Sequence, residues 1–144
     1  MNVPVLKLRP EAKLPAFSTK LAAGADLYAC LDRELRILPG ATGTVPIGIA
    51  VAIPAGYVGL VYARSGLSTR EGLAPANKVG VIDADYRGEI RVSLYNQSGQ
   101  VRTVRPGDRV AQLVIQKVET PIYEEAETLP PTERGIGGFG STGR

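Results

Sequence analysis

Residues 45–62 read VPIGIAVAIPAGYVGLVY, and β-branched apolar residues occupy every second position in the first half of this stretch. Valine or isoleucine stands at positions 45, 47, 49, 51 and 53, with small residues between them. This period-two alternation predicts a strand with one buried face. A Pro-Ala-Gly turn at 54–56 ends the run, and Val58, Leu60 and Tyr62 then repeat the pattern.

The same alternation recurs further along the chain, and turn signals separate the runs. Apolar residues alternate again at 90, 92 and 94, and then at 113 and 115 after Ala111. Pro-Gly, Ser-Gly and Pro-Gly-Asp sequences at 39–40, 98–99 and 106–108 mark turns between such runs. Short strands at this regular spacing predict an all-β domain, either a sandwich or a barrel.

Two segments depart from the strand pattern. Residues 65–72 (SGLSTREG) favour a helix of about two turns, because Ser65 is of a type that caps helix N-termini and a glycine ends the segment. The last ten residues contain five glycines together with Phe139. Such a tail is either a disordered end or an arm that closes over something.

Length and composition limit the classes of protein to consider. A chain of 144 residues with 44% hydrophobic and 22% charged residues fits one globular domain with a sizeable core. It has no histidine and a single cysteine, which excludes Ser-His-Asp and Cys-His nucleophiles, histidine bases, and histidine- or cysteine-rich metal sites. The net charge of +3, with no run of Lys or Arg, argues against nucleic-acid binding.

The hydropathy of the chain predicts no contact with a membrane. No apolar run approaches the roughly 18 residues that a spanning helix needs, and the N-terminal MNVPVLKLRP lacks the apolar stretch of a signal peptide. We therefore expect a cytoplasmic protein, and the lone Cys30 fits a reducing compartment.

The sequence ARSGL at 63–67 combines features that suit a phosphate group. A strand delivers Arg64 and Ser65 to the start of the predicted helix, where free backbone N–H groups attract anions. The arginine adds a charge-assisted donor, the serine adds a hydroxyl, and Gly66 allows a ligand close to the backbone. The alternative for this motif alone is a plain helix cap.

The sequence GVIDADYRGEI at 80–90 places two carboxylates, a tyrosine and an arginine between two apolar segments. We interpret it as a β-hairpin with Asp83 and Tyr86 near its bend. Since the chain has no histidine, Asp83 is a candidate base for activating water. The alternative is that Asp83 and Asp85 only cap turn amides.

Three further segments carry candidate ligand contacts, each with a simpler alternative. Asp26 precedes a strand and is otherwise a turn residue, and Gln112 lies on an apolar strand and is otherwise a structural amide. The tail RGIGGFGSTG at 134–143 combines an arginine, a ring and a flexible backbone, which favours a mobile lid over a phosphorylated, ring-containing ligand. Together these residues indicate a nucleotide hydrolase or a nucleotide binder and leave the nucleotide open.

In order and spacing, these segments resemble the five motifs of the homotrimeric dUTPase family (deoxyuridine 5′-triphosphate nucleotidohydrolases). The match runs from Ala23 to Gly143 and includes ARSGL, GVIDADYRGEI, GDRVAQL and RGIGGFGSTG. One departure is Ala63, where many members have proline, and it leaves the functional residues intact. The resemblance implies a jelly-roll-like β-barrel or sandwich over residues 1–131. It also implies a homotrimer, in which a flexible glycine-rich arm (132–144) of one chain covers a neighbour's site.

The resemblance also implies an activity and a role for each residue. The activity is hydrolysis of dUTP to dUMP and pyrophosphate, with Mg²⁺ held chiefly by the triphosphate, which keeps uracil out of DNA and supplies dUMP for thymidylate synthesis. Asp83 would activate the water and meet the sugar 3′-OH, Tyr86 would pack under the deoxyribose, and Asp26 would reach the metal through water. The other implied substrate contacts are Asn77, Gly80, Val81, Ile82 and Phe139 at the uracil, and Arg64, Ser65, Gly66, Gln112, Arg134, Ser141 and Thr142 on the phosphate side. Gly140 is a further implied substrate contact.

Two rival interpretations remain at this level. A dCTP deaminase shares the fold family but would carry its own catalytic glutamate and arginine motifs, and the GVIDADYRG sequence points away from it. A nucleotide sensor without catalysis would be favoured if Asp83 or the arm were absent, and both are present.

Overall fold

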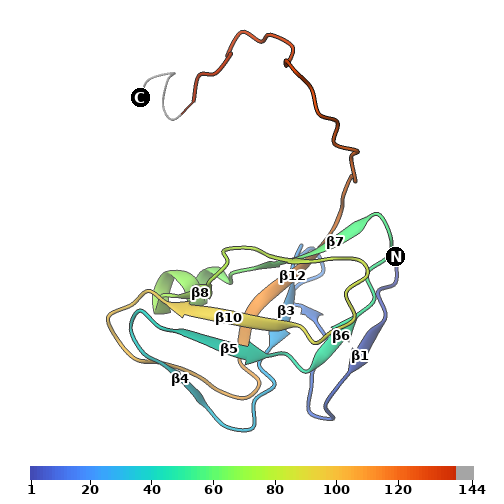
Figure 1. The fold of residues 1–144 in the computed structure, drawn as a ribbon. Coiled ribbons are helices and arrows are strands. Elements are labelled where there is room, and N and C mark those ends of the chain that lie inside the picture. Colours follow the sequence, from blue (N-terminus) through green and yellow to red (C-terminus); the bar gives the residue numbers. More distant parts are fainter. Residues whose placement is uncertain (139–144) are drawn as a thin grey trace.

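The computed structural model describes residues 1–138, which form an all-β body with one short helix and an extended C-terminal segment (Figure 1). This confirms the predicted fold class. The strands are β1 (Val5–Lys7), β2 (Ala16–Phe17), β3 (Ala25–Tyr28), β4 (Leu35–Ile37), β5 (Thr42–Pro46), β6 (Ile49–Val51), β7 (Tyr57–Tyr62), β8 (Leu73–Pro75), β9 (Gly80–Ile82), β10 (Arg91–Asn96), β11 (Arg102–Val104) and β12 (Arg109–Lys117). The helix, η1 (Leu67–Glu71), is a single π-helical turn between β7 and β8.

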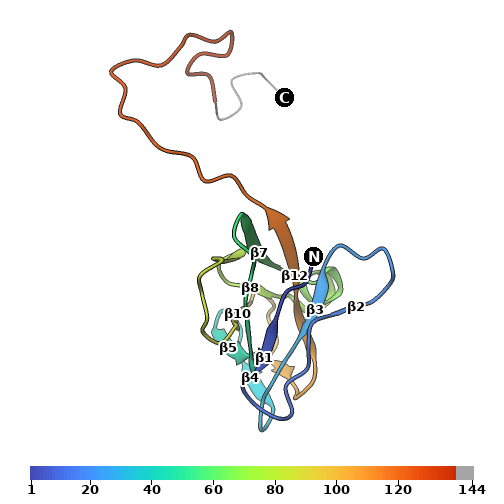
Figure 2. The ribbon, with the colours of Figure 1, turned by 90° about the vertical axis from the view of Figure 1, so that its right-hand side faces the viewer.

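The strands form two main sheets that enclose the core. A five-stranded sheet has the order β2-β3-β12-β7-β9, a three-stranded sheet has the order β5-β10-β8, and the pairs β1-β6 and β11-β4 complete the body. Figures 1 and 2 show the three-stranded sheet on one side of the body and the five-stranded sheet on the other. The long strand β12 lies between β3 and β7, so it joins segments that are far apart in the sequence.

The stretch from which we predicted the fold lies at the centre of the core. Every alternating residue from Val45 to Ile53 is buried, although the run is divided between β5 and β6 with Gly48 between them. The second run differs, because Val61 of β7 is buried whereas Val58, Leu60 and Tyr62 are half-buried. Since both faces of β7 are partly covered, its alternation alone does not distinguish the inner face from the outer one.

The hairpin interpretation of residues 80–90 is wrong in its pairing. β9 pairs with β7, whereas β10 pairs with β5 and β8, so the two strands belong to different sheets. Residues 83–89 form a loop that crosses from one sheet to the other, and we call this segment the Asp83 loop. It does place Asp83 and Tyr86 at a turn, since the Tyr86 N–H donates to the Asp83 carbonyl at 3.2 Å.

The predicted helix is present, and helical backbone runs from Ser65 to Glu71, with the part from Leu67 onward π-helical. No side-chain hydrogen bond caps its N-terminus, so the predicted capping role of Ser65 is not seen. The helix ends at Gly72, whose N–H donates to the Ser68 carbonyl at 3.1 Å. No helix among residues 1–138 is long and apolar enough to span a bilayer.

After β12 the chain leaves the body as an extended segment (Figures 1 and 2). The Val118 N–H donates to the Gly56 carbonyl at 3.0 Å, and within residues 1–138 the hydrogen bonds that follow it lie inside the segment itself. Ile122, Tyr123 and Leu129 expose most of their surface. The chain therefore departs earlier than the expected boundary between residues 131 and 132, and the division into domain and arm stays a prediction.

Candidate active site

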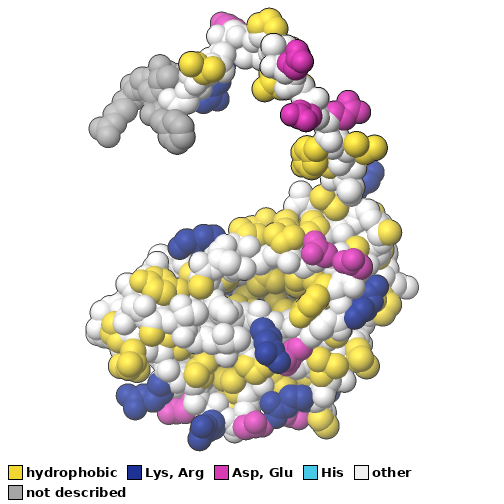
Figure 3. Space-filling model, viewed as in Figure 1, with side chains coloured by type: hydrophobic (Ala, Val, Ile, Leu, Met, Phe, Trp, Pro, Cys, Tyr) yellow, Lys and Arg dark blue, Asp and Glu magenta, His cyan; other side chains and the backbone are white. Residues whose placement is uncertain are grey.

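The Asp83 loop and β9 form one wall of a pocket of about 390 Å³, which we call the Asp83 pocket. It opens on the face shown in Figure 3, where hydrophobic side chains form the floor of a hollow between the loop and β10. The lining residues that are apolar include Val61, Ile82, Ile90 and Val92, and those that are polar include Asn77, Asp83, Glu89, Arg91 and Ser93. A pocket with an apolar floor and a polar rim suits a flat ring that carries hydrogen-bonding edges.

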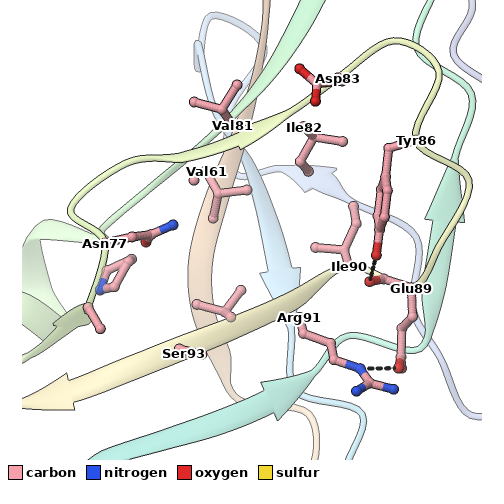
Figure 4. A pocket seen from close by; sticks show the side chains of 14 residues that line it. Val61, Asn77, Val81, Ile82, Asp83, Tyr86, Glu89, Ile90, Arg91 and Ser93 are labelled. Atoms are coloured by element: carbon pink, nitrogen blue, oxygen red, sulfur yellow. Dashed lines mark hydrogen bonds and ion pairs between the residues drawn. The ribbon is translucent and has the colours of Figure 1, made fainter.

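The pocket brings together the residues that we predicted to meet the base and the sugar. Asn77, Gly80, Val81, Ile82, Asp83 and Tyr86 all line it. In Figure 4 the Asn77 amide points into the pocket, and the Asp83 carboxylate lies at its outer rim. Asp83 is exposed, and among residues 1–138 no donor hydrogen-bonds to its carboxylate, so that group is available to a ligand or a water molecule.

Tyr86 lies three residues after Asp83 in the same loop, and its ring is held by a hydrogen bond. Its hydroxyl donates to the Glu89 carbonyl at 3.0 Å (Figure 4). The ring passes directly over Gly88, where a Cβ atom would lie 2.6 Å from the Tyr86 Cζ. A side chain at position 88 would displace the ring, so Gly88 allows the ring to lie against the loop as a wall of the pocket.

A second group of predicted residues lies in a separate pocket of about 340 Å³, the Asp26 pocket. Its lining includes Asp26 on β3, Gln112 on β12, and Arg64, Ser65 and Gly66 between β7 and the helix. Ser65 is exposed, and the Gln112 side-chain amide donates to the Ala63 carbonyl at 2.9 Å. That bond fixes Gln112 beside the backbone that leads into Arg64.

Asp26 is buried, and its carboxylate connects the two arginines Arg64 and Arg109 through hydrogen bonds. The Arg64 Nε donates to one carboxylate oxygen at 2.8 Å, and the Ser18 hydroxyl and Arg109 donate to the other at 3.0 and 3.2 Å. Burial pushes the pKa of Asp26 upward, but the Ser18 hydroxyl, the Arg64 charge and hydrogen bond, and the Arg109 hydrogen bond outweigh it, so the pKa lies below its ordinary value. Asp26 is therefore an ionised group that orients two arginines.

Positive charge extends beyond the Asp26 pocket. Arg64, Ser65 and Gly66 also line a larger polar hollow of about 540 Å³, together with Arg70, Arg105 and Arg109. The hollow has fewer carboxylates than arginines, because only Glu71 and Asp108 of its lining are acidic. The Asp108 carboxylate also accepts the Arg105 backbone N–H. Arginine donors around a polar hollow suit a polyanion such as a triphosphate.

Within one chain the two groups of predicted residues do not share a pocket. No residue lines both the Asp83 pocket and the Asp26 pocket. β7 connects them, because Val61 lines the first and Arg64 follows the end of that strand in the second. A site that contains both groups of predicted residues therefore requires the two pockets together.

The predicted arm residues are far from both pockets or outside the described residues. Arg134 lies on the extended segment, where its Nε donates to the Gly137 carbonyl at 2.9 Å, away from the body (Figures 1 and 2). Phe139, Gly140, Ser141 and Thr142 lie outside the described residues.

The residues of the Asp26 pocket constrain how a Mg²⁺ ion fits. No three of the described His, Cys, Asp and Glu residues are grouped so as to hold a metal ion. Direct ligation by Asp26 is disfavoured, because Arg64 and Arg109 already occupy both carboxylate oxygens with positive charge. The arrangement fits an ion carried by phosphates and reached by Asp26 through water, which is how Mg²⁺ commonly binds with nucleotides.

Sequence reasoning missed several residues of these pockets. Glu89, Arg91 and Ser93 line the Asp83 pocket, and Ser18 donates to Asp26. Glu89 had one available signal, because it lies inside the motif at 80–90, but its polar partner Gly48 is far away in the sequence. Ser18 gave no comparable signal.

Comparison with known proteins identifies the family and supports the fold. The dUTPase family model matches residues 10–143. The chain is 48% identical to the deoxyuridine 5′-triphosphate nucleotidohydrolase of Syntrophotalea carbinolica, with 99% of this chain and 97% of that protein covered. The solved dUTPase of Staphylococcus bacteriophage 80α with dUpNHpp has a TM-score of 0.86 and 28% identity, with 99% of both chains covered. A mutant dUTPase of the S. aureus phage phi11, described for its coordination of a structural Mg(II) ion, has a TM-score of 0.79 and 27% identity, with 89% of this chain and 98% of that chain covered.

Fold and pockets together define a class, an all-β protein with an apolar-floored pocket and a separate arginine-rich hollow. Within that class, the chain belongs to the dUTPase family.

Proposed function

We propose that this chain hydrolyses dUTP to dUMP and pyrophosphate at a site that combines the Asp83 pocket with the Asp26 pocket. As a member of its family the chain is an enzyme, a dUTP diphosphatase. The assignment of roles to its residues is carried by one observation: Asp83 has no hydrogen-bond donor to its carboxylate among residues 1–138 and stands at the rim of an apolar-floored pocket, beside a fixed tyrosine ring.

In the proposed mechanism, Asp83 acts as the general base. Its carboxylate takes a proton from a water molecule while the water oxygen forms a bond to the α-phosphorus. The bond from that phosphorus to the oxygen shared with the β-phosphate breaks, and pyrophosphate leaves with the electron pair. Asp83 also accepts a hydrogen bond from the sugar 3′-OH, which holds the nucleotide in line for attack.

Uracil is recognised by Asn77 and by the backbone of residues 80–83. Uracil and cytosine have opposite hydrogen-bond polarity at two adjacent ring positions, so fixed backbone groups would leave cytosine with unsatisfied pairs. Thymine differs by a methyl group, so its exclusion would be steric, at the wall that β9 and the Asp83 loop form. The ring of Tyr86 lies under the deoxyribose, where a ribose 2′-OH would need room.

The phosphates are held by Arg64, Ser65, Gly66 and Gln112. Asp26 supports this surface by orienting the Arg64 guanidinium, and it reaches a Mg²⁺ ion through water. Bound to the triphosphate, Mg²⁺ would neutralise its negative charge.

The working enzyme is a homotrimer in this proposal. The Asp83 pocket of one subunit faces the Asp26 pocket of a neighbour, which explains why the two groups of residues line separate pockets within one chain. Residues 132–144 form an arm that closes over a neighbouring site, with Phe139 over the uracil and Arg134, Gly140, Ser141 and Thr142 at the phosphates. We place the enzyme in the cytoplasm, where it keeps uracil out of DNA and supplies dUMP; its buried free Cys30 fits that reducing compartment.

Pyrophosphate release measured side by side with dUTP, dTTP, dCTP and UTP tests the proposal. We expect kcat/KM for dUTP to exceed that for each competitor by at least about 10²-fold, because each competitor leaves a polar group unpaired or collides with the pocket. Comparable values for dUTP and dCTP would remove the proposed recognition of uracil. Absence of turnover with dUTP, despite binding, would favour a nucleotide sensor.

A further inference from the structure

Glu89 is partly buried in the wall of the Asp83 pocket although it belongs to no part of the proposed chemistry. Its side chain is 18% exposed, and both carboxylate oxygens are used. One accepts the Gly48 N–H at 3.1 Å, and the other accepts the Arg91 Nε at 2.8 Å (Figure 4). Both oxygens of a partly buried carboxylate are therefore paired, one of them with a backbone N–H that is distant in the sequence.

Gly48 is a fixed anchor for this contact. Its φ of +73° lies in the left-handed region, and a Cβ atom there would lie 2.9 Å from Ala12 Cβ, so the position requires glycine. Its carbonyl accepts the Leu8 N–H at 2.8 Å. Gly48 also lies between two core strands, β5 and β6, which limits its movement.

The Asp83 loop has few other attachments to the body. Its remaining hydrogen bonds are local: the Tyr86 N–H to Asp83, and the Arg87 side chain to the Ala84 and Tyr86 carbonyls. Within residues 1–138, the bond from Gly48 to Glu89 is the hydrogen bond that ties residues 83–89 to a distant part of the chain. The backbone ladder resumes at Ile90, whose N–H donates to Ile49.

The same residue fixes the tyrosine ring. The Tyr86 hydroxyl donates to the Glu89 carbonyl. The peptide that carries this carbonyl also donates the Ile90 N–H to the Ile49 carbonyl at 2.9 Å, and the Glu89 side chain adds a second contact, with Gly48. The position of the ring therefore depends on a peptide that a backbone bond and the Glu89 side chain hold together. The proposed wall under the sugar distinguishes deoxyribose from ribose by steric contact, so the position of the ring matters. An error of about 1 Å in a positioning contact can change rates by roughly 10²-fold.

We propose that Glu89 is a positioning residue for sugar discrimination: it anchors the Asp83 loop to Gly48 and, through its carbonyl, sets the distance of the Tyr86 ring from the sugar. This inference rests on the proposed role of Tyr86 as the wall under the deoxyribose. Glu89 touches no reacting atom and acts through Tyr86.

The test compares kcat/KM for dUTP and for UTP in a set of variants. Glu89→Ala should lower the ratio of kcat/KM for dUTP to kcat/KM for UTP by at least about tenfold. Glu89→Gln should retain most of the ratio, because its side-chain oxygen still accepts the Gly48 N–H. Glu89→Asp keeps the charge but is too short to reach Gly48, so it should behave like Glu89→Ala. Glu34→Ala, which removes an exposed glutamate elsewhere, is the matched control.

A second arm of the experiment examines the route through the hydroxyl. Tyr86→Phe should lower the ratio in the same way, and the double variant Tyr86→Phe/Glu89→Ala should be no worse than the more affected single variant. Additive losses would overturn the proposed route. Melting temperatures are measured for all variants. If Glu89 were merely structural, its substitution would lower the melting temperature and leave the ratio of the two kcat/KM values at its wild-type level.

The outcomes separate this inference from the proposed function. If Tyr86→Ala leaves the ratio unchanged, Tyr86 is not the wall, and the proposed function fails at that residue. If Tyr86→Ala lowers the ratio but Glu89→Ala and Glu89→Asp do not, the wall is correct and the role of Glu89 is wrong. If Glu89→Ala does not fold, the Gln and Asp variants decide, and equal ratios in those two would overturn the anchor.

Discussion

Asp83 stands at a turn between two sheets, and among residues 1–138 its carboxylate accepts no hydrogen bond. Replacing it with Asn keeps the size of the side chain but removes the basic oxygen. We expect Asp83→Asn to bind dUTP with little change and to lower kcat by at least roughly 10²-fold, the usual contribution of a general base. Binding is followed with a non-hydrolysable dUTP analogue, and turnover by pyrophosphate release. A kcat within a few-fold of wild type would remove Asp83 from the mechanism.

Asp26 makes a prediction about stability rather than turnover. Because the partly exposed Arg64 and Arg109 would lose a buried counter-ion, Asp26→Asn should destabilise the fold by about 2 kcal/mol at neutral pH. The pKa of Asp26 is lower in the folded chain than in the unfolded one, so its contribution is complete above the unfolded value of about 4 and is lost as the pH falls through the folded pKa. Urea denaturation of both proteins from pH 7 to pH 3 measures this.

The difference in the free energy of unfolding between wild type and Asp26→Asn should therefore be constant from pH 7 to about pH 5 and should shrink below pH 4. Arg64→Gln serves as a comparison, since it removes one partner of Asp26, and it should make the loss smaller and complete at a higher pH. A difference that grows on acidification would contradict the assigned pKa direction.

At the scale of elements, the sequence predicted what depends on local pattern. The alternation from Val45 to Ile53 identified buried strands, because a strand's side chains alternate between faces whatever it pairs with. The partner of a strand is a long-range property, so nothing between Gly80 and Ile90 indicated that β9 and β10 join different sheets. The hairpin interpretation failed for that reason.

The candidate site divides in the same way. Asp83, Tyr86 and Arg64 could be singled out because each motif is a contiguous run of suitable residue types. The contacts that hold them could not, since Gly48 and Glu89 are separated by 41 positions and Asp26 and Arg109 by 83. Single-sequence patterns carry no information on such pairs, and only the folded chain reveals that Glu89 is anchored.

The extended C-terminal segment makes a prediction as an element. Its described hydrogen bonds are internal beyond Val118, so a chain that ends after Pro131 should keep the body intact. We expect the melting temperature to change by less than about 3 °C, which corresponds to less than about 1 kcal/mol for a chain of this size. Activity should nevertheless fall steeply, because the truncation removes Arg134 and Phe139 and with them the closing of the site. Loss of the folded body would show that residues 132–144 belong to it.

At the scale of the whole molecule, mixing of subunits distinguishes an arm that acts on its own chain from one that acts on a neighbour. A chain truncated after Pro131 retains Asp83, and an Asp83→Asn chain retains the arm. If the arm acts across subunits, trimers that contain both chains should regain activity well above either parent, because one chain supplies the base and another the lid.

Subunit exchange is confirmed by native mass spectrometry of tagged chains before the assay. The control mixes the truncated chain with a chain that carries both Asp83→Asn and the truncation, and it should stay inactive. Confirmed mixed trimers without recovery would mean that the arm closes over the base of its own subunit, and the two separate pockets of one chain would then have to be joined by movement within it.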